Sequence, residues 1–360
     1  MMRILIAAGG TGGHIYPGIA VAKEILRRDP ESEVLFVGAE RGLEKKIVPD
    51  NGFELSLIDS TALKSVGLIG QIKGVAILPK SFLQARRIIR DFRPDVVVGA
   101  GGYVSGPVLL MASLLRYPTL VMDSNALPGF TNRRLARFVD QAALTFEEAV
   151  PYFGKKSVVT GNPVRKEFFE IEPKKRDPEE FSVLIFGGSQ GARGINLAMV
   201  DALKHLGDFK DKLRIKHQTG QFDFEKVKAG YAENGWEEAD VAVYISEMVA
   251  EFAKADLIVS RAGATTCAEV AAAGKAAIMI PLPTAADDHQ RNNAEAFQAA
   301  GAGVMILQKD LTGEVLAEKI KGFINAPEKI TAMEQAAKKL AKSDAAGATV
   351  DLIEKLAGDF

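Results

Sequence analysis

Apolar segments alternate with amphipathic segments along the whole chain, which predicts strands and helices in turn. The predicted strands of the first half span residues 3–8, 33–38, 53–58, 95–99, 118–122, 141–146 and 156–160. Those of the second half span residues 182–187, 212–218, 241–245, 256–260, 276–280 and 303–307. Helical periodicity lies between them, for example over residues 18–28 and 192–206. Such strands, joined by helices, are typical of parallel sheets covered on both faces, so the expected fold class is α/β.

A long-range repeat predicts two domains. Residues 4–13 (ILIAAGGTGG) resemble residues 183–192 (VLIFGGSQGA), and each copy is an apolar strand that runs into a glycine turn and then a helix. Each copy would begin a doubly wound sheet of its own. The 360 residues also exceed the roughly 250–300 that a single core supports. We therefore expect an N-terminal domain over residues 1–163 and a C-terminal domain over 164–340. The closing helix, 341–360, is a candidate to rejoin the first domain.

The composition argues against several classes of protein. The net charge of −1 argues against a nucleic-acid partner. The one cysteine, Cys267, excludes an internal disulfide framework and suits a reducing cytoplasm. Residues 96–115 carry no charge, but glycines and a proline divide them into strand, loop and helix, so we expect no membrane span. The first residues run straight into a strand, and no signal peptide is expected.

The stretch from Ser260 to Gly274 carries the strongest chemical signal. A strand ends at Ser260, a turn of small residues follows, and an alanine-rich helix runs to Gly274. The free backbone N–H groups at the start of such a helix form a seat for an anion. Glu269, one turn into the helix, can accept two hydrogen bonds from the vicinal diol of a ribose. A diphosphate seat beside a ribose acceptor predicts a nucleotide site in the second half of the chain.

Three glycine loops follow other strands. The first, 9–14, matches neither the dinucleotide motif nor the Walker A motif, although Glu40 after the second strand keeps a ribose-binding role open. The second, 99–107, would lie at the same edge of the sheet, so the diphosphate of an acceptor could lie between the two. The third, 187–192, contains Ser189, whose hydroxyl can donate to a phosphate. Each loop could instead serve only to turn the chain.

His14 closes the first loop, just before a helix that we expect to begin near Pro17. The dipole at a helix N-terminus disfavours the charged imidazole, so a neutral His14 could act as a general base. The alternative is a histidine that only hydrogen-bonds a nearby carbonyl. No D-x-D motif, HExxH motif or cysteine cluster occurs, so we expect neither a metal site nor a cofactor.

The segment 61–93 combines seven basic residues and one acidic residue with many apolar residues. Two interpretations are open. The segment could form a surface that rests on anionic lipid, or it could be an amphipathic helix whose apolar face is simply core.

Taken in order, five motifs closely resemble those of the MurG family: GGTGGH (9–14), GGYVSGP (101–107), TGNPVR (160–165), GGSQGA (187–192) and RAGATT (261–266). This family contains bacterial transferases that move N-acetylglucosamine from UDP-N-acetylglucosamine to undecaprenyl-pyrophosphoryl-N-acetylmuramoyl pentapeptide, in peptidoglycan synthesis. The resemblance implies the GT-B fold, in which two Rossmann-like, doubly wound parallel-sheet domains face each other across a cleft. It also implies a peripheral enzyme at the cytoplasmic face of the cell membrane, with the segment 61–93 resting on anionic lipid.

The resemblance further implies roles for individual residues. The donor contacts that it implies are Thr11, Gly12, Gly13, Asn125, Arg165, Ser189, Ile245, Ala264, Thr265, Thr266, Glu269 and Gln290. Among them, the main chain near Ile245 would meet the uracil, and Glu269 would take the ribose hydroxyls. Arg261 would have a supporting role.

For the acceptor, the resemblance implies an inverting attack by the C4 hydroxyl of N-acetylmuramic acid on C1 of N-acetylglucosamine. The acceptor diphosphate would lie beside Gly101, Gly102 and Tyr103, and His14 is the candidate base. The chain departs from the family pattern at Asp123, where a glutamate is usual, and at His289, where a second glutamine is usual. The roles of these two residues are therefore open.

Other functions also fit parts of the pattern. A related GT-B enzyme, either a glycolipid glycosyltransferase or a UDP-N-acetylglucosamine epimerase, would share the glycine loops. An NAD-dependent oxidoreductase would share only the Rossmann-like strands and glycines. A non-catalytic nucleotide-sugar-binding protein would bind the donor and turn nothing over.

Overall fold

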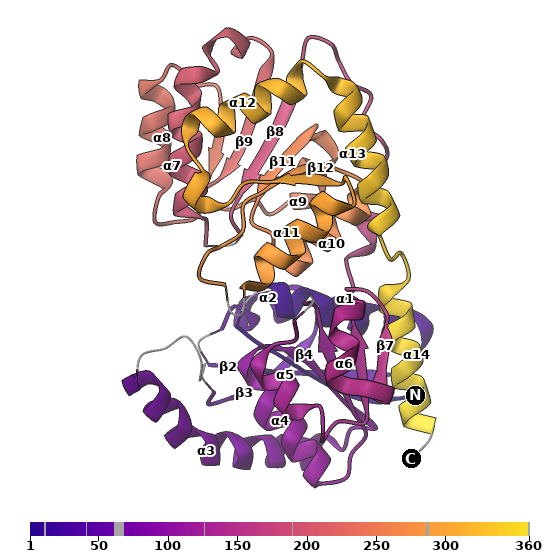
Figure 1. Ribbon diagram of the computed structural model, residues 1–360. Coiled ribbons are helices and arrows are strands. Elements are labelled where there is room, and N and C mark those ends of the chain that lie inside the picture. Colours follow the sequence, from indigo (N-terminus) through magenta and orange to yellow (C-terminus); the bar gives the residue numbers. More distant parts are fainter. Residues whose placement is uncertain are drawn as a thin grey trace. The chain divides into compact units, whose positions relative to one another are not determined.

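The computed structural model describes residues 1–10, 12–40, 42–60, 68–125, 127–188, 190–285 and 288–358. Contacts divide the chain into two compact units, each built on a parallel sheet (Figure 1). Unit 1 comprises Met1–Arg165 and the segment from Asp344 onward, and unit 2 comprises Lys166–Ser343. The expected α/β class, with one doubly wound sheet in each half, is confirmed.

Unit 1 contains a seven-stranded sheet of order β3-β2-β1-β4-β5-β6-β7, in which every neighbouring pair is parallel. Its first strand lies near the middle, and the chain winds outward from it in both directions. The strands are β1 (Arg3–Ala8), β2 (Glu33–Ala39), β3 (Glu54–Ile58), β4 (Val96–Gly101), β5 (Thr119–Asp123), β6 (Gln141–Leu144) and β7 (Ser157–Val159).

Helices cover both faces of this sheet because side chains alternate along each strand. Ile4 and Ile6 of β1 join one apolar cluster with the first and last helices, whereas Leu5 and Ala7 join a second cluster on the other face. The helices are α1 (Gly12–Arg28), α2 (Glu44–Asp50), α3 (Leu68–Phe92), α4 (Gly102–Leu114), α5 (Phe130–Leu135), α6 (Val150–Phe153) and α14 (Ala345–Gly358).

Unit 2 repeats this topology with a six-stranded parallel sheet of order β10-β9-β8-β11-β12-β13. The repeat between residues 4–13 and 183–192 therefore marks the first strand of each sheet. The strands are β8 (Phe181–Phe186), β9 (Leu213–Gln218), β10 (Asp240–Ala242), β11 (Leu257–Ser260), β12 (Ala276–Met279) and β13 (Gly303–Met305).

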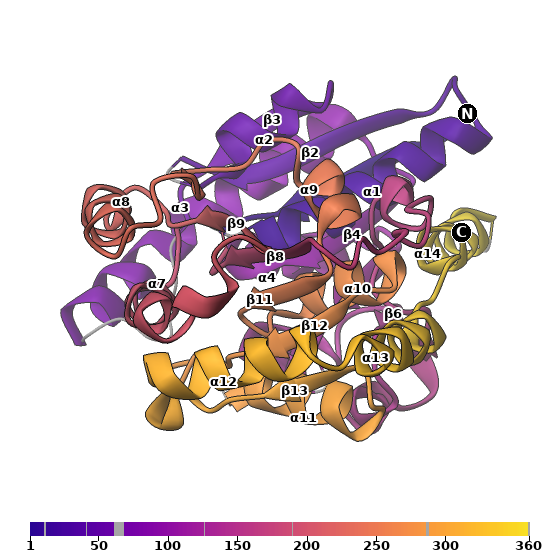
Figure 2. The same cartoon turned by 90° about the horizontal axis from the view of Figure 1, so that it is seen from above.

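The helices of unit 2 also lie on both faces of its sheet. Val183 and Ile185 of β8 face a cluster shared with α7 and α12, which pack side by side (Figures 1 and 2). On the opposite face, Phe186 contacts Phe252 of α9, with ring centroids 5.8 Å apart. The helices are α7 (Arg193–Ala202), α8 (Phe224–Glu233), α9 (Met248–Lys254), α10 (Ala264–Ala273), α11 (His289–Ala299), α12 (Gly313–Ile324) and α13 (Pro327–Leu340).

The last helix, α14, belongs to unit 1 and packs on α1. Its side chains Val350, Ile353 and Leu356 enter the cluster that contains α1. Arg28 at the end of α1 adds polar contacts, because its guanidinium lies 2.6 Å from Asp351 and 3.1 Å from Glu354. The end of the chain thus forms two helices, α13 in unit 2 and α14 in unit 1.

Within the described ranges, no helix has both the length and the hydropathy that crossing a membrane requires. The uncharged stretch 96–115 is instead β4 followed directly by α4, with Gly101 as the residue between strand and helix geometry. The first seven residues of the segment 61–93 lie outside the described residues, and the rest from Leu68 to Phe92 is α3.

Candidate functional site

The candidate residues of unit 1 follow the carboxyl ends of its strands, at the point where the strand order reverses. Open parallel sheets bind ligands at this switch point, which here lies between β1 and β4. The loop after β4 packs directly on the loop after β1. Gly102 has φ +78°, and a Cβ there would lie 2.0 Å from the carbonyl oxygen of Gly9. The expectation that the two loops lie side by side is confirmed, and only glycine permits so close an approach.

His14 lies in the first turn of α1, because this helix begins at Gly12 and not near Pro17 as expected. The two glycines at 12 and 13 accept helical geometry, so the helix starts directly after the turn. The half-buried imidazole packs on Gly101: a Cβ at Gly101, where φ is +113°, would lie 2.3 Å from Nδ1 of His14. The structure therefore brings His14 to the loop that was expected to hold the acceptor diphosphate. Thr11 lies outside the described residues.

A buried glutamate, Glu44, fixes the glycine loop after β1. This residue was not identified from the sequence. The carboxyl group of Glu44 accepts hydrogen bonds from the N–H of Gly10 at 3.2 Å and the N–H of Ala39 at 2.8 Å. Glu44 is fully buried. Three glycines make room for it, since a Cβ at Gly9, Gly38 or Gly42 would lie within 3.0 Å of its side chain. The N–H of Gly10 is thus already used and cannot serve a phosphate.

Glu40, the weaker sequence candidate for a ribose contact, lies at the surface. Its carboxylate pairs with Lys45 at 3.2 Å, and its side chain is 56% exposed.

The loop at the start of α4 is fixed by hydrogen bonds. The single O–H of the buried Ser105 lies within hydrogen-bond distance of the carbonyl oxygens of Ala7 and Gly101, at 2.9 and 2.8 Å, and its oxygen accepts from the N–H of Gly101 at 3.0 Å. Tyr103 is half-buried in the same loop, and its carbonyl accepts a bond of 3.0 Å from the Ser60 hydroxyl. Burial, followed by the charge of Glu44, raises the pKa of Tyr103. The phenol is therefore a hydrogen-bond donor at neutral pH.

The acid at 123, where the chain departs from the family pattern, organises the loop after β5. Asp123 is buried and accepts hydrogen bonds from the N–H of Asn125 and of Gly129, each at 3.0 Å, and from Nδ2 of Asn132 at 2.8 Å. Burial raises the pKa of Asp123, and these hydrogen bonds oppose the shift. The carboxyl group thereby fixes the position of Asn125, which is one of the expected donor contacts.

Arg165 lies close to the start of α1. The guanidinium carbon lies 5.2 Å from the centre of the Tyr16 ring, within the range of a cation–π contact. The same ring packs against Gly12, where a Cβ would lie 3.2 Å from it. Two expected donor contacts, Arg165 and Gly12, thus meet through Tyr16.

In unit 2 the switch point lies between β8 and β11, and α10 begins directly after β11. The N-cap of α10 is Gly263, which offers no side-chain hydrogen bond to the first turn. Ala264, Thr265 and Thr266 form that turn and are half-buried. Glu269 is also half-buried and lies three and four residues beyond the two threonines, so all three share one face of the helix. The expected anion seat and ribose acceptor are therefore adjacent.

Arg261 and Gln290 fix the loop that follows β12. The buried guanidinium of Arg261 donates to the carbonyl oxygens of Ile280 and Pro281 at 3.0 and 3.1 Å, and to Oε1 of Gln308 at 2.6 Å. Burial lowers the pKa of Arg261. Oε1 of Gln290 accepts a bond of 3.0 Å from the N–H of Leu282, so its amide N–H₂ is the group that could reach a ligand. These contacts suit the supporting role expected of Arg261.

Gln218, the last residue of β9, joins the loops after β8 and β10. It was not identified from the sequence. Its Nε2 donates to the carbonyl oxygen of Gly188 at 2.9 Å, and its Oε1 accepts from the N–H of Ile245 at 2.7 Å. The glycine turn after β8 and the main chain at Ile245 are therefore joined. Ser189 lies outside the described residues.

Two groups that can be reactive elsewhere are structural here. Burial raises the pKa of the Cys267 thiol to about 12, which leaves it protonated and unreactive. Burial lowers the pKa of His217 to about 3, and its ring nitrogens lie 3.0 Å from the Tyr231 hydroxyl and 3.1 Å from Oδ1 of Asn196.

His289 is half-buried in the first turn of α11. In the part of the chain that the structure describes, no three His, Cys, Asp or Glu side chains group as metal ligands would.

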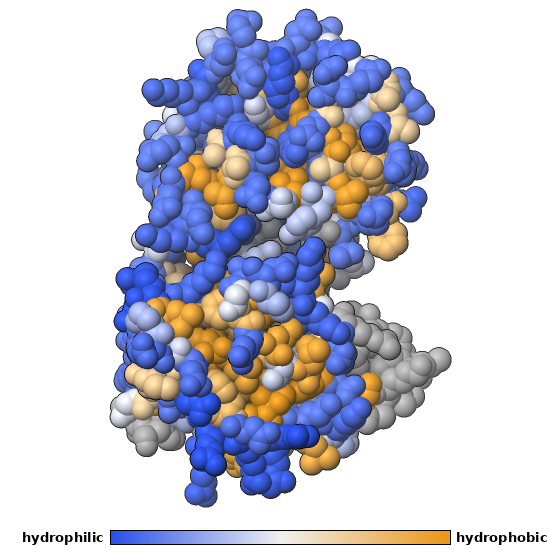
Figure 3. Space-filling view, turned by 180° about the vertical axis from the view of Figure 1, so that it is seen from behind, coloured by the Kyte–Doolittle hydropathy of each residue, from blue (hydrophilic) through white to orange (hydrophobic). Residues whose placement is uncertain are grey.

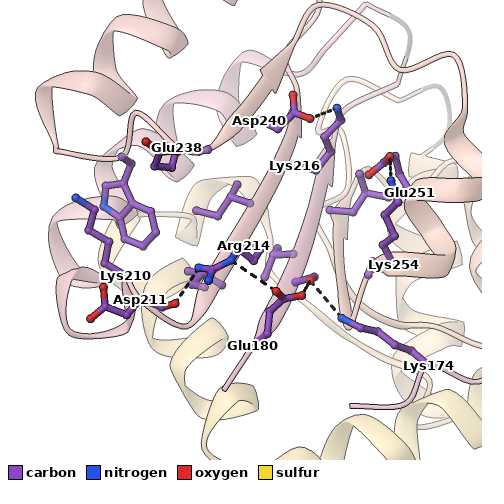
Figure 4. Close-up of a pocket in the computed structure, with 18 residues that line it drawn as sticks. Lys174, Glu180, Lys210, Asp211, Arg214, Lys216, Glu238, Asp240, Glu251 and Lys254 are labelled. Atoms are coloured by element: carbon purple, nitrogen blue, oxygen red, sulfur yellow. Dashed lines mark hydrogen bonds and ion pairs between the residues drawn. The ribbon is translucent and has the colours of Figure 1, made fainter. Parts of the chain in front are cut away.

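A cavity of about 760 Å³ in unit 2 lies away from these residues. It opens between the amino-terminal halves of β8 and β9 and the end of α9, whereas the candidate residues follow the carboxyl ends of the strands (Figure 4). Its charged side chains largely pair with one another, as Lys254 does with Glu251 at 2.8 Å and Lys216 with Asp240. None of the described candidate residues lines it, so we do not assign it to the nucleotide.

Comparisons with known proteins agree with the arrangement of the two sheets. Residues 4–144 match the glycosyltransferase family 28 N-terminal domain, and residues 182–348 match the family 28 C-terminal domain. A protein of Anaeromyxobacter sp. (strain Fw109-5) is 48% identical over 358 residues, which cover 99% of this chain and 93% of the relative. It is named UDP-N-acetylglucosamine–N-acetylmuramyl-(pentapeptide) pyrophosphoryl-undecaprenol N-acetylglucosamine transferase.

Solved structures are similar over nearly the whole chain. The crystal structure of Acinetobacter baumannii MurG is 34% identical, with a TM-score of 0.78 and coverage of 99% of this chain and 100% of the other. A UDP-N-acetylglucosamine 2-epimerase of Neisseria meningitidis, bound to UDP-N-acetylglucosamine, has a TM-score of 0.68 at 16% identity, with 98% and 100% coverage. The second likeness concerns the fold alone.

Proposed function

The chain belongs to glycosyltransferase family 28, and we propose that it transfers N-acetylglucosamine from UDP-N-acetylglucosamine to undecaprenyl-pyrophosphoryl-N-acetylmuramoyl pentapeptide. The observation that carries this proposal is the 48% identity, over 99% of the chain, to a relative named for that reaction. The product would be the disaccharide-linked lipid used in peptidoglycan synthesis and cell-wall biogenesis.

The donor would bind chiefly to unit 2. The first turn of α10 directs the backbone N–H groups of Ala264, Thr265 and Thr266 outward, and its dipole favours the negative charge of a diphosphate. Glu269, on the same face, would accept hydrogen bonds from the ribose hydroxyls. Only the carbonyl of Ile245 would be left to the uracil, because its N–H is taken by Gln218.

Other donor contacts would come from the residues already matched to the family. They are Thr11, Gly12, Gly13, Asn125 and Arg165 of unit 1, and Ser189 and Gln290 of unit 2.

The chemical step would be an inverting displacement. The C4 hydroxyl of N-acetylmuramic acid attacks C1 of N-acetylglucosamine, the bond from C1 to the diphosphate oxygen breaks, and UDP leaves with the electron pair. His14, in the first turn of α1, would take the proton of the attacking hydroxyl as a general base. The α10 dipole would stabilise the charge that develops on UDP.

The acceptor diphosphate would bind beside His14, at Gly101, Gly102 and Tyr103. The N-terminus of α4 begins at Gly102 and supplies backbone N–H groups, and the phenol of Tyr103 supplies a donor.

We also propose that α3 and its neighbour α4 rest on the anionic cytoplasmic face of the cell membrane. Leu83 of α3 and Leu114 of α4 are 65% and 66% exposed, and the two helices pack together. Arg86, Arg87 and Arg90 are exposed on α3. The rear face of unit 1 exposes both apolar and hydrophilic residues (Figure 3). Exposed apolar side chains beside arginines favour contact with anionic lipid.

The transfer is tested with the purified protein, UDP-N-acetylglucosamine and a short-chain analogue of the lipid-linked acceptor. We expect release of UDP and formation of a β-1,4 disaccharide, with activity retained in the presence of a chelator because no D-x-D motif occurs. Formation of UDP-N-acetylmannosamine without acceptor would identify an epimerase instead. Transfer to diacylglycerol in place of the lipid-linked sugar would identify a glycolipid transferase.

Membrane contact is tested by sedimentation with vesicles of phosphatidylglycerol and phosphatidylcholine. Replacement of Arg86 and Arg87 by glutamate should weaken binding strongly. The matched control replaces Lys226 and Lys228 of α8, which are exposed in unit 2, by glutamate and makes the same change of charge. If both variants lose vesicle binding equally, the loss is a general effect of charge, and the role of α3 is contradicted.

A further inference from the structure

Gln218 is buried at the end of β9, with only 2% of its surface exposed. Its amide has one donor and one acceptor end, and each is used by a different loop. The donor end bonds to the carbonyl of Gly188 in the turn after β8, at 2.9 Å. The acceptor end bonds to the N–H of Ile245 after β10, at 2.7 Å. A buried amide with both ends used fixes its two partners relative to each other.

The loops on either side of this amide are already tightly packed. Gly191 has φ +76°, and a Cβ there would lie 1.8 Å from the carbonyl oxygen of Thr219. Gly220 also has φ +76°, and a Cβ there would lie 2.1 Å from the carbonyl oxygen of Gln190. The main chain of Gly220 in turn donates to Val243 at 3.1 Å. Backbone contacts thus connect three loops as far as Val243, and Gln218 extends the connection to Ile245.

We propose that Gln218 is a positioning residue for the nucleotide donor, through its simultaneous hold on the glycine turn at Gly188 and on the main chain at Ile245. This inference rests on the proposed function, in which the turn lies near the diphosphate and Ile245 near the base. A nucleoside diphosphate binds both regions at once, so the distance between them must match the ligand. Replacement of Gln218 by glutamate keeps the hydrogen-bond acceptor and removes the donor. Replacement by methionine keeps the length of the side chain and removes both.

The test compares the wild type with Gln218→Glu and Gln218→Met in the transfer assay. We expect the donor KM to rise about 10-fold in Gln218→Met, because two hydrogen bonds to the loops are lost. The acceptor KM should stay unchanged, and kcat should fall much less than the donor affinity. A general loss of folding would instead lower the fraction of active enzyme, and so reduce kcat without this split.

The pH dependence of the donor KM gives a second measurement, which a purely structural role of Gln218 would not alter. When the carboxyl group introduced by Gln218→Glu is protonated, it regains a donor for the Gly188 carbonyl. The donor KM of Gln218→Glu, expressed relative to the wild type at the same pH, should therefore fall as the pH is lowered toward about 5. The KM ratio for Gln218→Met should not change with pH. The matched control is Gln298→Met, since Oε1 of Gln298 also accepts a backbone N–H, that of Met305, at 2.9 Å. We expect this control to keep the wild-type donor KM.

The outcomes separate this inference from the proposed function. If the wild type neither binds UDP in calorimetry nor releases it in the assay, the proposed function fails whatever Gln218 does. If the wild type binds UDP and both Gln218 variants keep its donor KM, or if Gln218→Glu shows no recovery in acid, the inference is overturned.

If both variants fail to fold, the inference is tested by amide hydrogen exchange of the wild type with and without UDP. Added UDP should protect the peptides around 188 and 245 together, and protection of only one of them would overturn the inference.

Discussion

Gly101→Ala tests whether the loop after β4 positions His14 for chemistry. The added Cβ would lie 2.3 Å from Nδ1 of the imidazole and 3.0 Å from its Cε1 and Cγ. Real carbon contacts of this kind are ordinary only beyond 3.4 Å, so the ring must shift by about 1 Å. Nothing else in the substitution removes a charged or hydrogen-bonding group. The change therefore displaces the candidate base and leaves its identity intact.

The expected effect on the rate follows from that displacement. Moving a reacting group by about 1 Å lowers a rate by about 100-fold, which corresponds to about 2.7 kcal/mol in the barrier. A second effect acts on stability, because φ is +113° and ψ is 179° at this position, a conformation in which alanine costs about 1–3 kcal/mol. The two effects must be measured separately.

Gly52→Ala is the matched control. Gly52 has φ +83° in the same unit, and a Cβ there would meet nothing within 4 Å, so this variant carries the backbone strain without a clash. UDP release with the acceptor analogue gives kcat, calorimetry gives the UDP Kd, and thermal unfolding gives Tm. We expect both variants to lose stability, only Gly101→Ala to lose kcat, and both to keep the UDP Kd. Equal kcat values in the two variants would refute the positioning of His14 by Gly101.

Three further predictions follow from the same geometry. His14→Ala should lower kcat about 100-fold or more with a nearly unchanged donor KM, because general-base catalysis contributes about 10²–10⁴-fold; normal turnover in the transfer assay would remove His14 from this role. Glu269→Ala should mainly raise the donor KM, by about 10-fold, since a ribose contact is lost; an unchanged KM would contradict that contact. Glu24→Gln should destabilise the packing of α1 against α14 in a pH-dependent way. Hydrogen bonds from Arg27, and then from Arg28, lower the pKa of Glu24 to about 2, from 4.5. Because these surface ion pairs are screened by solvent, its contribution is about 1 kcal/mol; it is present above pH 4.5 and lost as the pH falls toward 2. The difference in Tm between wild type and variant should shrink over that interval, and a constant difference would argue against the linkage.

Much of the fold could be predicted from the sequence because its signals are local. Each predicted strand is present in the described residues, since a run of apolar residues between helices has few other ways to bury both faces. Helix boundaries were predicted less accurately. The start of α1 at Gly12 went unrecognised because glycine and proline usually mark the outside of a helix, although both occur inside this one. α13 and α14 pack in different units, and from the sequence alone the closing helix was only a candidate to rejoin the first domain.

The candidate site could be predicted only in part, for a related reason. Residues recognised from motifs, such as Glu269, stand next to each other in the sequence or at helical spacing. Glu44 and Gln218 act over long separations: Glu44 bonds to Gly10, and Gln218 bonds to Gly188. The only local sign of the buried acid is the pair of glycines before it, at 38 and 42, whose missing side chains leave the space it fills.

The difference between Glu44 and Gln218 also explains why the two glycine turns of the repeat, after β1 and after β8, would have different functions. Each loop leaves the central strand of its sheet through a glycine turn, and each is held by one buried polar side chain. In unit 1 that side chain is an acid, Glu44, which takes the N–H of Gly10 and lies under the loop that carries His14. A negative group there disfavours a phosphate at the turn and suits a site whose task is to remove a proton. In unit 2 the side chain is a neutral amide, Gln218, which binds a carbonyl of the turn after β8 and adds no negative charge there. An anion is therefore disfavoured at the turn after β1 but not at the turn after β8. Two substitutions that exchange the acid and the amide test this division. Gln218→Glu should weaken UDP binding at neutral pH. Glu44→Gln should leave UDP binding unchanged and lower kcat. Loss of UDP affinity in Glu44→Gln would place the diphosphate at the first loop and contradict this division.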